Sequence, residues 1–160
     1  MSFKPVVLIY DLDNNLVDEI AATIGATGLY TSINTYNEAN AIDVLQQYNR
    51  GLGLLTNKIS CVITGWNTHK SPRDQLLFKI REIEKRSPLR QATPVIIITE
   101  DHMLDLKKLA LNPAEGGVAA YLHTEKYLDE LPGLLHKVVY LSEAEALNKL
   151  AFEEVMRGTD

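Results

Sequence analysis

The sequence predicts a three-layer α/β fold, in which a five-stranded parallel sheet lies between two layers of helices and one extra helix follows at the C-terminus. Two observations predict it. Five short apolar runs are almost continuous, which is typical of strands buried on both faces. Between them lie stretches whose apolar residues recur at helical spacing. Regular alternation of strand and helix predicts parallel βα units with right-handed crossovers.

The predicted strands differ in the position that we expect them to take in the sheet. The run VIIIT at 95–99 is the most hydrophobic and is therefore expected to be central. The run at 59–64 leads into a polar loop, and loops at the carboxyl edge of an open parallel sheet are where ligands bind. In chain order the strands are predicted at 6–10, 29–34, 59–64, 95–99 and 118–122.

Capping residues indicate where three of the helices begin. Asn14 or Asn15 is predicted to cap the first helix, because a short polar side chain accepts from the free N–H groups there. Ser71 followed by Pro72 predicts the N-cap and first residue of the third helix. Asp101 is predicted to cap the fourth helix.

Two helices are predicted in the C-terminal part of the chain. The fifth is predicted at 126–140, where Pro132 predicts a delayed start or a kink because proline lacks the backbone N–H. Ser142 and Glu145 then form the capping-box pattern that starts a further helix.

This last helix, 142–160, is extra to the five-unit pattern of the domain predicted at 1–141. Three roles for it stay open: it packs on the domain, leads into another domain of a longer chain, or forms a coiled-coil dimer contact. Its apolar positions are Leu147, Leu150, Ala151, Phe152 and Val155.

Composition limits the class of protein. The 160 residues suit one domain, with 46% hydrophobic and 23% charged residues and a net charge of −5. The basic stretch at 79–90 is interleaved with glutamates, which indicates a solvated helix face, so we expect no direct nucleic-acid binding. No apolar run approaches the ~18 residues of a membrane span, and we expect a cytoplasmic location without membrane contact. Cys61 is expected to be a buried thiol.

Three motifs follow the pattern of one known family. They are VITGWN at 62–67, TPVIIIT ending at Thr99, and GGVAAYL, which contains Tyr121. Together with the order of elements over roughly residues 5–140, they resemble the response-regulator receiver domain, the CheY-like family of two-component and phosphorelay signal transduction. The resemblance implies a flavodoxin-like (βα)5 sandwich and places Thr99 and Tyr121 at the family's two switch positions.

The catalytic pattern of that family is broken in three places. Gly65 stands where receivers carry the aspartate that accepts the phosphoryl group. Asp11 matches the first acid of the Mg²⁺-binding pair, but Leu12 occupies the second place and Asp13 is one residue out of step. The family's lysine position holds Thr124, and the nearest lysine is Lys126.

These losses remove separate parts of one reaction. Phosphoryl transfer needs a nucleophile, a divalent cation and a fixed positive group for the developing charge. Glycine supplies no nucleophile, and one carboxylate in register is a poor Mg²⁺ site. We therefore expect a pseudo-receiver with no catalytic residues, no metal or cofactor and no enzyme activity. Three rescues would contradict this: Asp13 entering the pocket, Lys126 reaching back, or His69 accepting phosphate.

The expected mode of action is protein–protein contact. The resemblance implies an output or dimer surface, and a partner that is a histidine kinase, an output domain, another regulator or a second copy. Trp66 and Asn67 are a further possible partner contact, although Trp66 would equally cover the pocket as local packing. The residues of the implied switch and output surface are Thr99, Lys107, Lys108, Tyr121, Lys126 and Tyr127.

Other functions remain open at this stage. The same edge would suit a small-molecule or anion sensor, helped by helix N-termini near Ser71 and Asp101. The chain would also suit a receiver-like accessory domain of a larger protein, such as the wing of an amino-acid decarboxylase. A hydrolase or transferase of flavodoxin-like fold has no supporting catalytic motif.

Overall fold

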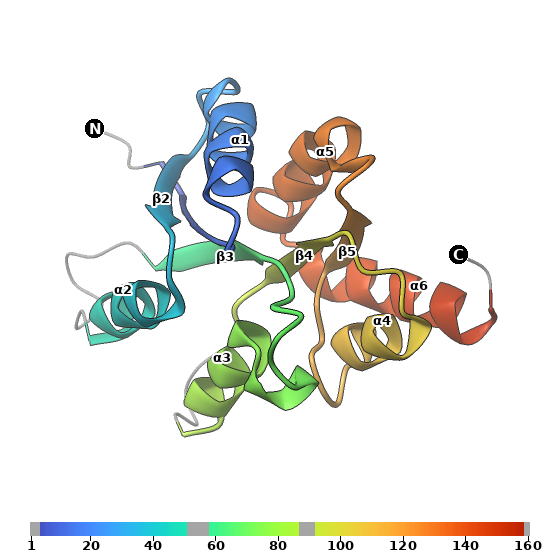
Figure 1. The fold of residues 1–160 in the computed structure, drawn as a ribbon. Helices are drawn as coiled ribbons and strands as arrows, with labels where there is room; N and C mark the ends of the chain where they lie inside the picture. Colours follow the sequence, from blue (N-terminus) through green and yellow to red (C-terminus); the bar gives the residue numbers. More distant parts are fainter. Residues whose placement is uncertain (1–3, 51–57, 87–91, 159–160) are drawn as a thin grey trace.

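A computed structural model describes residues 4–50, 58–86 and 92–158. Its centre is a five-stranded parallel sheet in the order β2-β1-β3-β4-β5, with helices on both faces (Figure 1). This confirms the predicted fold class. The strands are β1 (Val6–Tyr10), β2 (Thr31–Thr35), β3 (Ile59–Thr64), β4 (Val95–Thr99) and β5 (Ala120–His123).

The helices form the two outer layers. Helices α1 and α5 cover one face of the sheet, and α2, α3 and α4 cover the other (Figure 1). A sixth helix, α6, follows α5 and is the extra C-terminal helix. The bounds are α1 (Asn14–Gly25), α2 (Glu38–Arg50), α3 (Leu76–Lys85), α4 (Leu104–Leu111), α5 (Tyr127–Val139) and α6 (Ala144–Met156).

The sheet is buried on both sides because most residues of its interior strands are apolar, whichever face they point to. In β4, Ile96 and Ile98 face the α1–α5 layer, while Val95 and Ile97 face the layer of α2, α3 and α4. This alternation is the two-residue period of a strand. All five residues of β4 are buried, and β4 is an interior strand, but the central strand of the sheet is β3 and not β4 as predicted.

The carboxyl ends of four strands meet at one edge. Tyr10 at the end of β1 pairs with Thr64 at the end of β3, and Thr99 at the end of β4 pairs with His123 at the end of β5. The residues that follow these ends therefore lie close together, as expected for a parallel sheet.

Helix α6 packs on the domain, which is the first of the three predicted roles. It lies beside the edge strand β5, between α4 and α5 (Figure 1). Ala144 and Leu147 pack against the core under α5, whereas Phe152 packs against the core under α4. Asn148 is buried between them and donates to the carbonyl oxygens of Leu111 and Val118, at 2.8 and 2.7 Å.

Several predicted helix starts are wrong in detail. Asp13, and not Asn14 or Asn15, caps α1. Ser71 and Pro72 begin a 3-10 turn (Pro72–Asp74), and α3 starts after Gln75.

The starts of the fourth and last helices also differ from the prediction. The N-cap residue of α4 is Met103, whose N–H donates to the Asp101 carboxylate at 2.7 Å. The capping box at the start of α6 does not form: Ser142 has a φ of 55°, and Glu143 is the N-cap residue without a side-chain hydrogen bond. Among the described residues, no helix is both long and apolar enough to cross a membrane.

Candidate functional site at the carboxyl edge of the sheet

Gly65 follows β3, and the carboxylate of Asp11 from the neighbouring strand β1 lies against it. A Cβ atom on residue 65 would overlap Asp11 Oδ2 and would lie 2.9 Å from the carbonyl oxygen of Ile98. Real Cβ atoms essentially never come that close to another heavy atom. The edge is therefore shaped around a residue without a side chain at position 65.

Asp11 is held by the backbone of its own loop. Its Oδ1 accepts the N–H of Asp13 at 2.9 Å. Burial raises the pKa of the Asp11 carboxyl group, and the negative charges of Asp13 and Glu100 raise it further, against the lowering effect of backbone hydrogen bonds. This carboxyl group therefore binds a proton more readily than an exposed aspartate does.

Asp13, the second acidic residue of this loop, is the N-cap residue of α1. Asp13 Oδ1 accepts from the N–H groups of Asn15 at 3.0 Å and Leu16 at 3.3 Å, which caps α1. Leu12, between the two acids, is 52% exposed. Mg²⁺ requires several oxygen ligands in near-octahedral arrangement. With Asp13 committed to α1 and no side chain on residue 65, the donor set does not fit a Mg²⁺ site.

Lys126 is exposed and lies at the N-terminus of α5, where its N–H donates to the carbonyl oxygen of His123 at 3.0 Å. Thr124 is half-buried, and its N–H donates to the Thr99 carbonyl oxygen. Thr99 is buried, and its hydroxyl oxygen accepts the N–H of Asp101 at 3.0 Å. Thr99 thus fixes the loop that leads into α4.

Trp66 and Tyr121 are joined across the edge. The Trp66 indole N–H donates to the Tyr121 hydroxyl at 2.9 Å, and the indole stacks on Phe78 with ring centres 6.5 Å apart. The Lys107 ammonium lies 5.9 Å from the centre of the Tyr121 ring. Burial raises the pKa of Tyr121 to about 12, so its hydroxyl keeps its proton at neutral pH. These contacts agree with local packing of Trp66, and its role as a partner contact stays a prediction.

Gln75 is a site residue that the sequence did not reveal. Its buried amide accepts the N–H of Asn67 at 2.7 Å and donates to the carbonyl oxygens of Asn67 at 2.7 Å and Lys70 at 3.3 Å. The Asn67 side chain accepts the N–H of His69. Asn67 and Gln75 together fix the loop after β3. A polar residue at the first turn of a helix is too common to have identified Gln75.

The predicted output surface is only partly at the surface. Tyr127 is 1% exposed, and its hydroxyl donates to the carboxylate of Glu19 on α1, so its prediction as a surface residue is wrong. One buried stripe of α5 contains Tyr127, Leu131 and Leu135. Their i, i+4, i+8 spacing could have indicated from the sequence that Tyr127 is buried. Lys107 and Lys108 are half-buried on α4.

Two histidines also meet at this edge. The rings of His102 and His123 stack with their centres 4.3 Å apart, and His102 Nε2 lies 3.5 Å from the Glu125 carboxylate. His123 Nδ1 is buried without a hydrogen-bond partner. Burial lowers the pKa of His123, and His102 and Lys107 lower it further.

Comparison with known proteins gives similarity in structure only. No protein-family model matches the sequence, and no curated protein matches it. A response-regulator receiver domain protein from Clostridium thermocellum has a TM-score of 0.64 at 19% identity, covering 87% of this chain and 97% of that one. The signal receiver domain of an HD domain-containing protein from Pseudomonas fluorescens Pf-5 has a TM-score of 0.65 at 20% identity, covering 89% and 98%.

A third structure aligns over more of this chain. The RcsB response regulator of Salmonella typhimurium has a TM-score of 0.67 at 13% identity, covering 97% of this chain and 69% of that one. These similarities show that the chain has the fold of CheY-like receiver domains.

Proposed function

We propose that this chain is a receiver-like signalling domain that acts by protein–protein contact, without phosphorylation of its own and without enzyme activity. The observation that carries the proposal is the contact between Asp11 and Gly65. Where a receiver needs an acceptor side chain, the Asp11 carboxylate and the Ile98 carbonyl oxygen leave no room for one.

The neighbouring residues support the same proposal. The carboxylate of Asp13 caps α1, and Leu12 presents an apolar side chain to solvent. Lys126 is exposed at the start of α5. A phosphoryl-transfer site brings a nucleophile, a cation and a fixed positive group to one point. The described residues of this edge supply none of the three in that arrangement.

Thr99 and Tyr121, at the family's switch positions, would then hold the domain in one conformation. Tyr121 is buried and bonded to Trp66, and Thr99 is bonded to the loop before α4. A ligand shifts a conformational equilibrium only through a difference in affinity for the two states. With no phosphoryl group to provide that difference, we propose that the domain presents a single fixed conformation to its partner.

Incubation with acetyl phosphate and Mg²⁺, followed by intact mass spectrometry, tests the proposal. We expect no gain of a phosphoryl group in the wild type. The variant Gly65→Asp is also expected to stay unmodified, because the acid pair and the lysine are still out of place. A stoichiometric phosphoryl group on the wild type, on His69 or any other residue, would overturn the proposal.

A further inference from the structure

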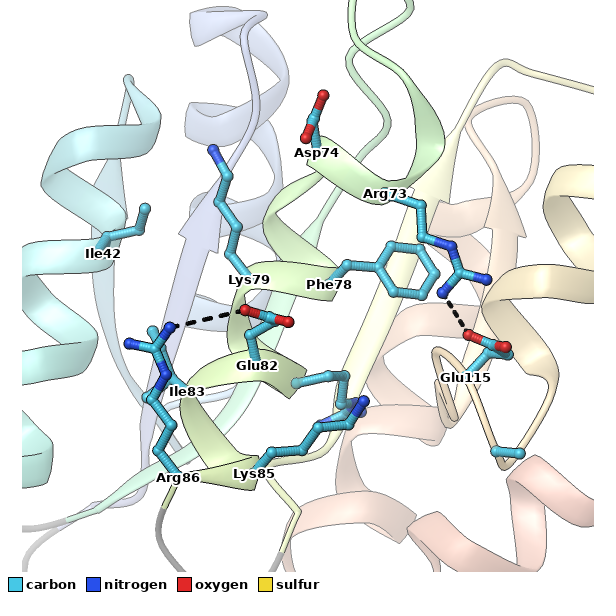
Figure 2. Close-up of a pocket in the computed structure, with 12 residues that line it drawn as sticks. Ile42, Arg73, Asp74, Phe78, Lys79, Glu82, Ile83, Lys85, Arg86 and Glu115 are labelled. Atoms are coloured by element: carbon cyan, nitrogen blue, oxygen red, sulfur yellow. Dashed lines mark hydrogen bonds and ion pairs between the residues drawn. The ribbon is translucent and has the colours of Figure 1, made fainter.

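A hollow of about 530 Å³ lies on the outer face of α3, and its lining includes Arg73 and Asp74 from the turn before that helix. Figure 2 shows α3 running through it, with Ile42 of α2 on one side and Glu115, from the turn between α4 and β5, on the other. Its floor is apolar: Phe78 is buried, and Ile42 and Ile83 are half-buried.

The rim of this hollow is basic, although the chain as a whole carries −5. Five basic and three acidic side chains line the hollow. The Arg81 guanidinium is held in place by intramolecular hydrogen bonds, because it donates to Glu84 and to the carbonyl oxygens of Gly116 and Thr93. The other basic residues are Arg73, Lys79, Lys85 and Arg86.

Two ion pairs at the rim are exposed and therefore exchangeable, whereas Lys79 pairs with Glu38, whose side chain is only 13% exposed. Arg73 pairs with Glu115 at 2.5 Å and Arg86 with Glu82 at 3.8 Å, and the two arginine side chains are 62% and 80% exposed. Exposed pairs of this kind are weak, because water screens the attraction between the two charges. Carboxylates of a partner would replace them at little cost. Arg73 also lies 5.4 Å from the centre of the Phe78 ring, which places a cation directly over the apolar floor.

A second observation favours the α3 hollow over the surface of α4, β5 and α5 as the place where a partner binds. In receivers the surface of α4, β5 and α5 is the implied output face, but here α6 lies beside β5 between α4 and α5. Asn148 and Val155 anchor α6 by burial. A partner of this chain would have to displace a packed helix to use that surface, whereas the α3 hollow is open among the residues that the structure describes.

We infer that the α3 hollow, defined by Arg73, Phe78, Lys79, Ile83, Lys85 and Arg86, binds an acidic segment of a partner protein that carries an apolar anchor. This inference rests on the proposed function, in which the chain acts by contact. Carboxylates meet the basic rim, and an apolar side chain meets the floor beside Phe78. The apolar floor, which includes Ile42 and Ile83, suits an apolar side chain of a peptide better than the phosphate backbone of a nucleic acid, so we take a protein as the occupant.

The test uses the full chain and an acetylated, amidated peptide of sequence Glu-Glu-Leu-Leu-Glu-Glu-Glu. Titration followed by amide chemical shifts is expected to move residues 73–86 and to weaken as salt rises from about 50 to about 200 mM. The double variant Arg73→Glu/Arg86→Glu is expected to weaken binding about tenfold or more. The matched control Lys137→Glu/Lys149→Glu changes the net charge equally on exposed positions of α5 and α6 and is expected to bind as the wild type does.

Loss of affinity in both double variants alike, or no binding by the wild type, would overturn the inference. Preferential binding of single-stranded DNA at these residues would also overturn it, because the occupant would then be of another class. Circular dichroism melts check that the variants fold. A phosphoryl group found on the wild type would instead refute the proposed function, so the two failures are distinguishable.

Discussion

The carboxylate of Asp11 lies in the space that the side chain of residue 65 would occupy. The two residues come from neighbouring strands, β1 and β3, and meet because these strands end at the same edge of the sheet. The absence of a side chain at Gly65 and the position of Asp11 are therefore one structural feature. Any side chain placed at position 65 would require Asp11 to move.

Gly65→Ala is expected to lower the free energy of unfolding by about 1–3 kcal/mol, because the new methyl group overlaps Asp11 and the Ile98 carbonyl oxygen. Adding Asp11→Ala is expected to recover only part of this loss, since the carbonyl oxygen remains. Urea unfolding measures both. The control is Gly133→Ala in α5, where a Cβ meets nothing within 4 Å, and a gain of about 0.5–1 kcal/mol is expected. Equal effects of the two alanines would contradict the account of the edge.

Gln75→Met keeps the approximate size of the side chain and removes its hydrogen bonds to Asn67 and Lys70. The free energy of unfolding is expected to fall by about 1–3 kcal/mol, because backbone groups of the loop lose their partners. Hydrogen exchange at the Asn67 amide should become faster. Gln46→Met makes the same exchange at an exposed position of α2 and should leave both quantities nearly unchanged. If hydrogen exchange at the Asn67 amide stayed slow in Gln75→Met, contacts other than those of Gln75 would hold the loop.

The His123 pKa is lowered in the folded state, chiefly by burial and also by His102 and Lys107. The unfolded chain therefore binds a proton more readily at this residue, with a pKa of about 6.5. The contribution of neutral His123 is fully present above that pH and is lost as the pH falls through the folded pKa. His123→Phe is expected to reduce the loss of stability between about pH 7 and about pH 5, measured by urea unfolding. His69→Phe, at an exposed position, should keep the wild-type pH dependence; an identical dependence in His123→Phe would contradict the assignment.

Asn148→Ala removes both hydrogen bonds from α6 to the Leu111 and Val118 carbonyl oxygens. The free energy of unfolding is expected to fall by about 1–3 kcal/mol. Lys149→Ala, at the exposed neighbouring position, should stay within about 0.5 kcal/mol of the wild type. Equal stabilities of the two variants would mean that α6 is not anchored through Asn148.

The sheet was predictable from sequence because strands buried on both faces are apolar at nearly every position, as in the first four residues of VIIIT in β4. Two strand starts were predicted too early: β2 begins at Thr31 and β5 at Ala120, each two residues after the predicted start. Val118 and Ala119 are buried although they precede β5, so an apolar run does not by itself mark where a strand begins. The prediction of helix caps failed where several neighbouring polar residues could accept from the same backbone N–H groups. At the start of α1, for example, Asp13 is the cap, but it is followed directly by Asn14 and Asn15.

The sequence indicated which positions of this edge depart from the family pattern, but it did not indicate the contacts that the residues of the edge make. Gly65 and Leu12 were identified from their positions in the family pattern. The position of the Asp11 carboxylate depends on side-chain packing between strands, which no local pattern encodes. The same holds for the amide of Gln75 and for the stacking of His102 on His123.

Trp66 is the single tryptophan of the chain, so its indole N–H gives one resonance that reports directly on the bond to Tyr121. Tyr121→Phe, which removes the acceptor, calibrates the shift expected when that bond is lost. On addition of Mg²⁺ and acetyl phosphate to the wild type, we predict that the resonance stays single and unshifted. Movement of the resonance toward its Tyr121→Phe position, or a second resonance, would contradict a receiver-like domain held in one state without phosphate.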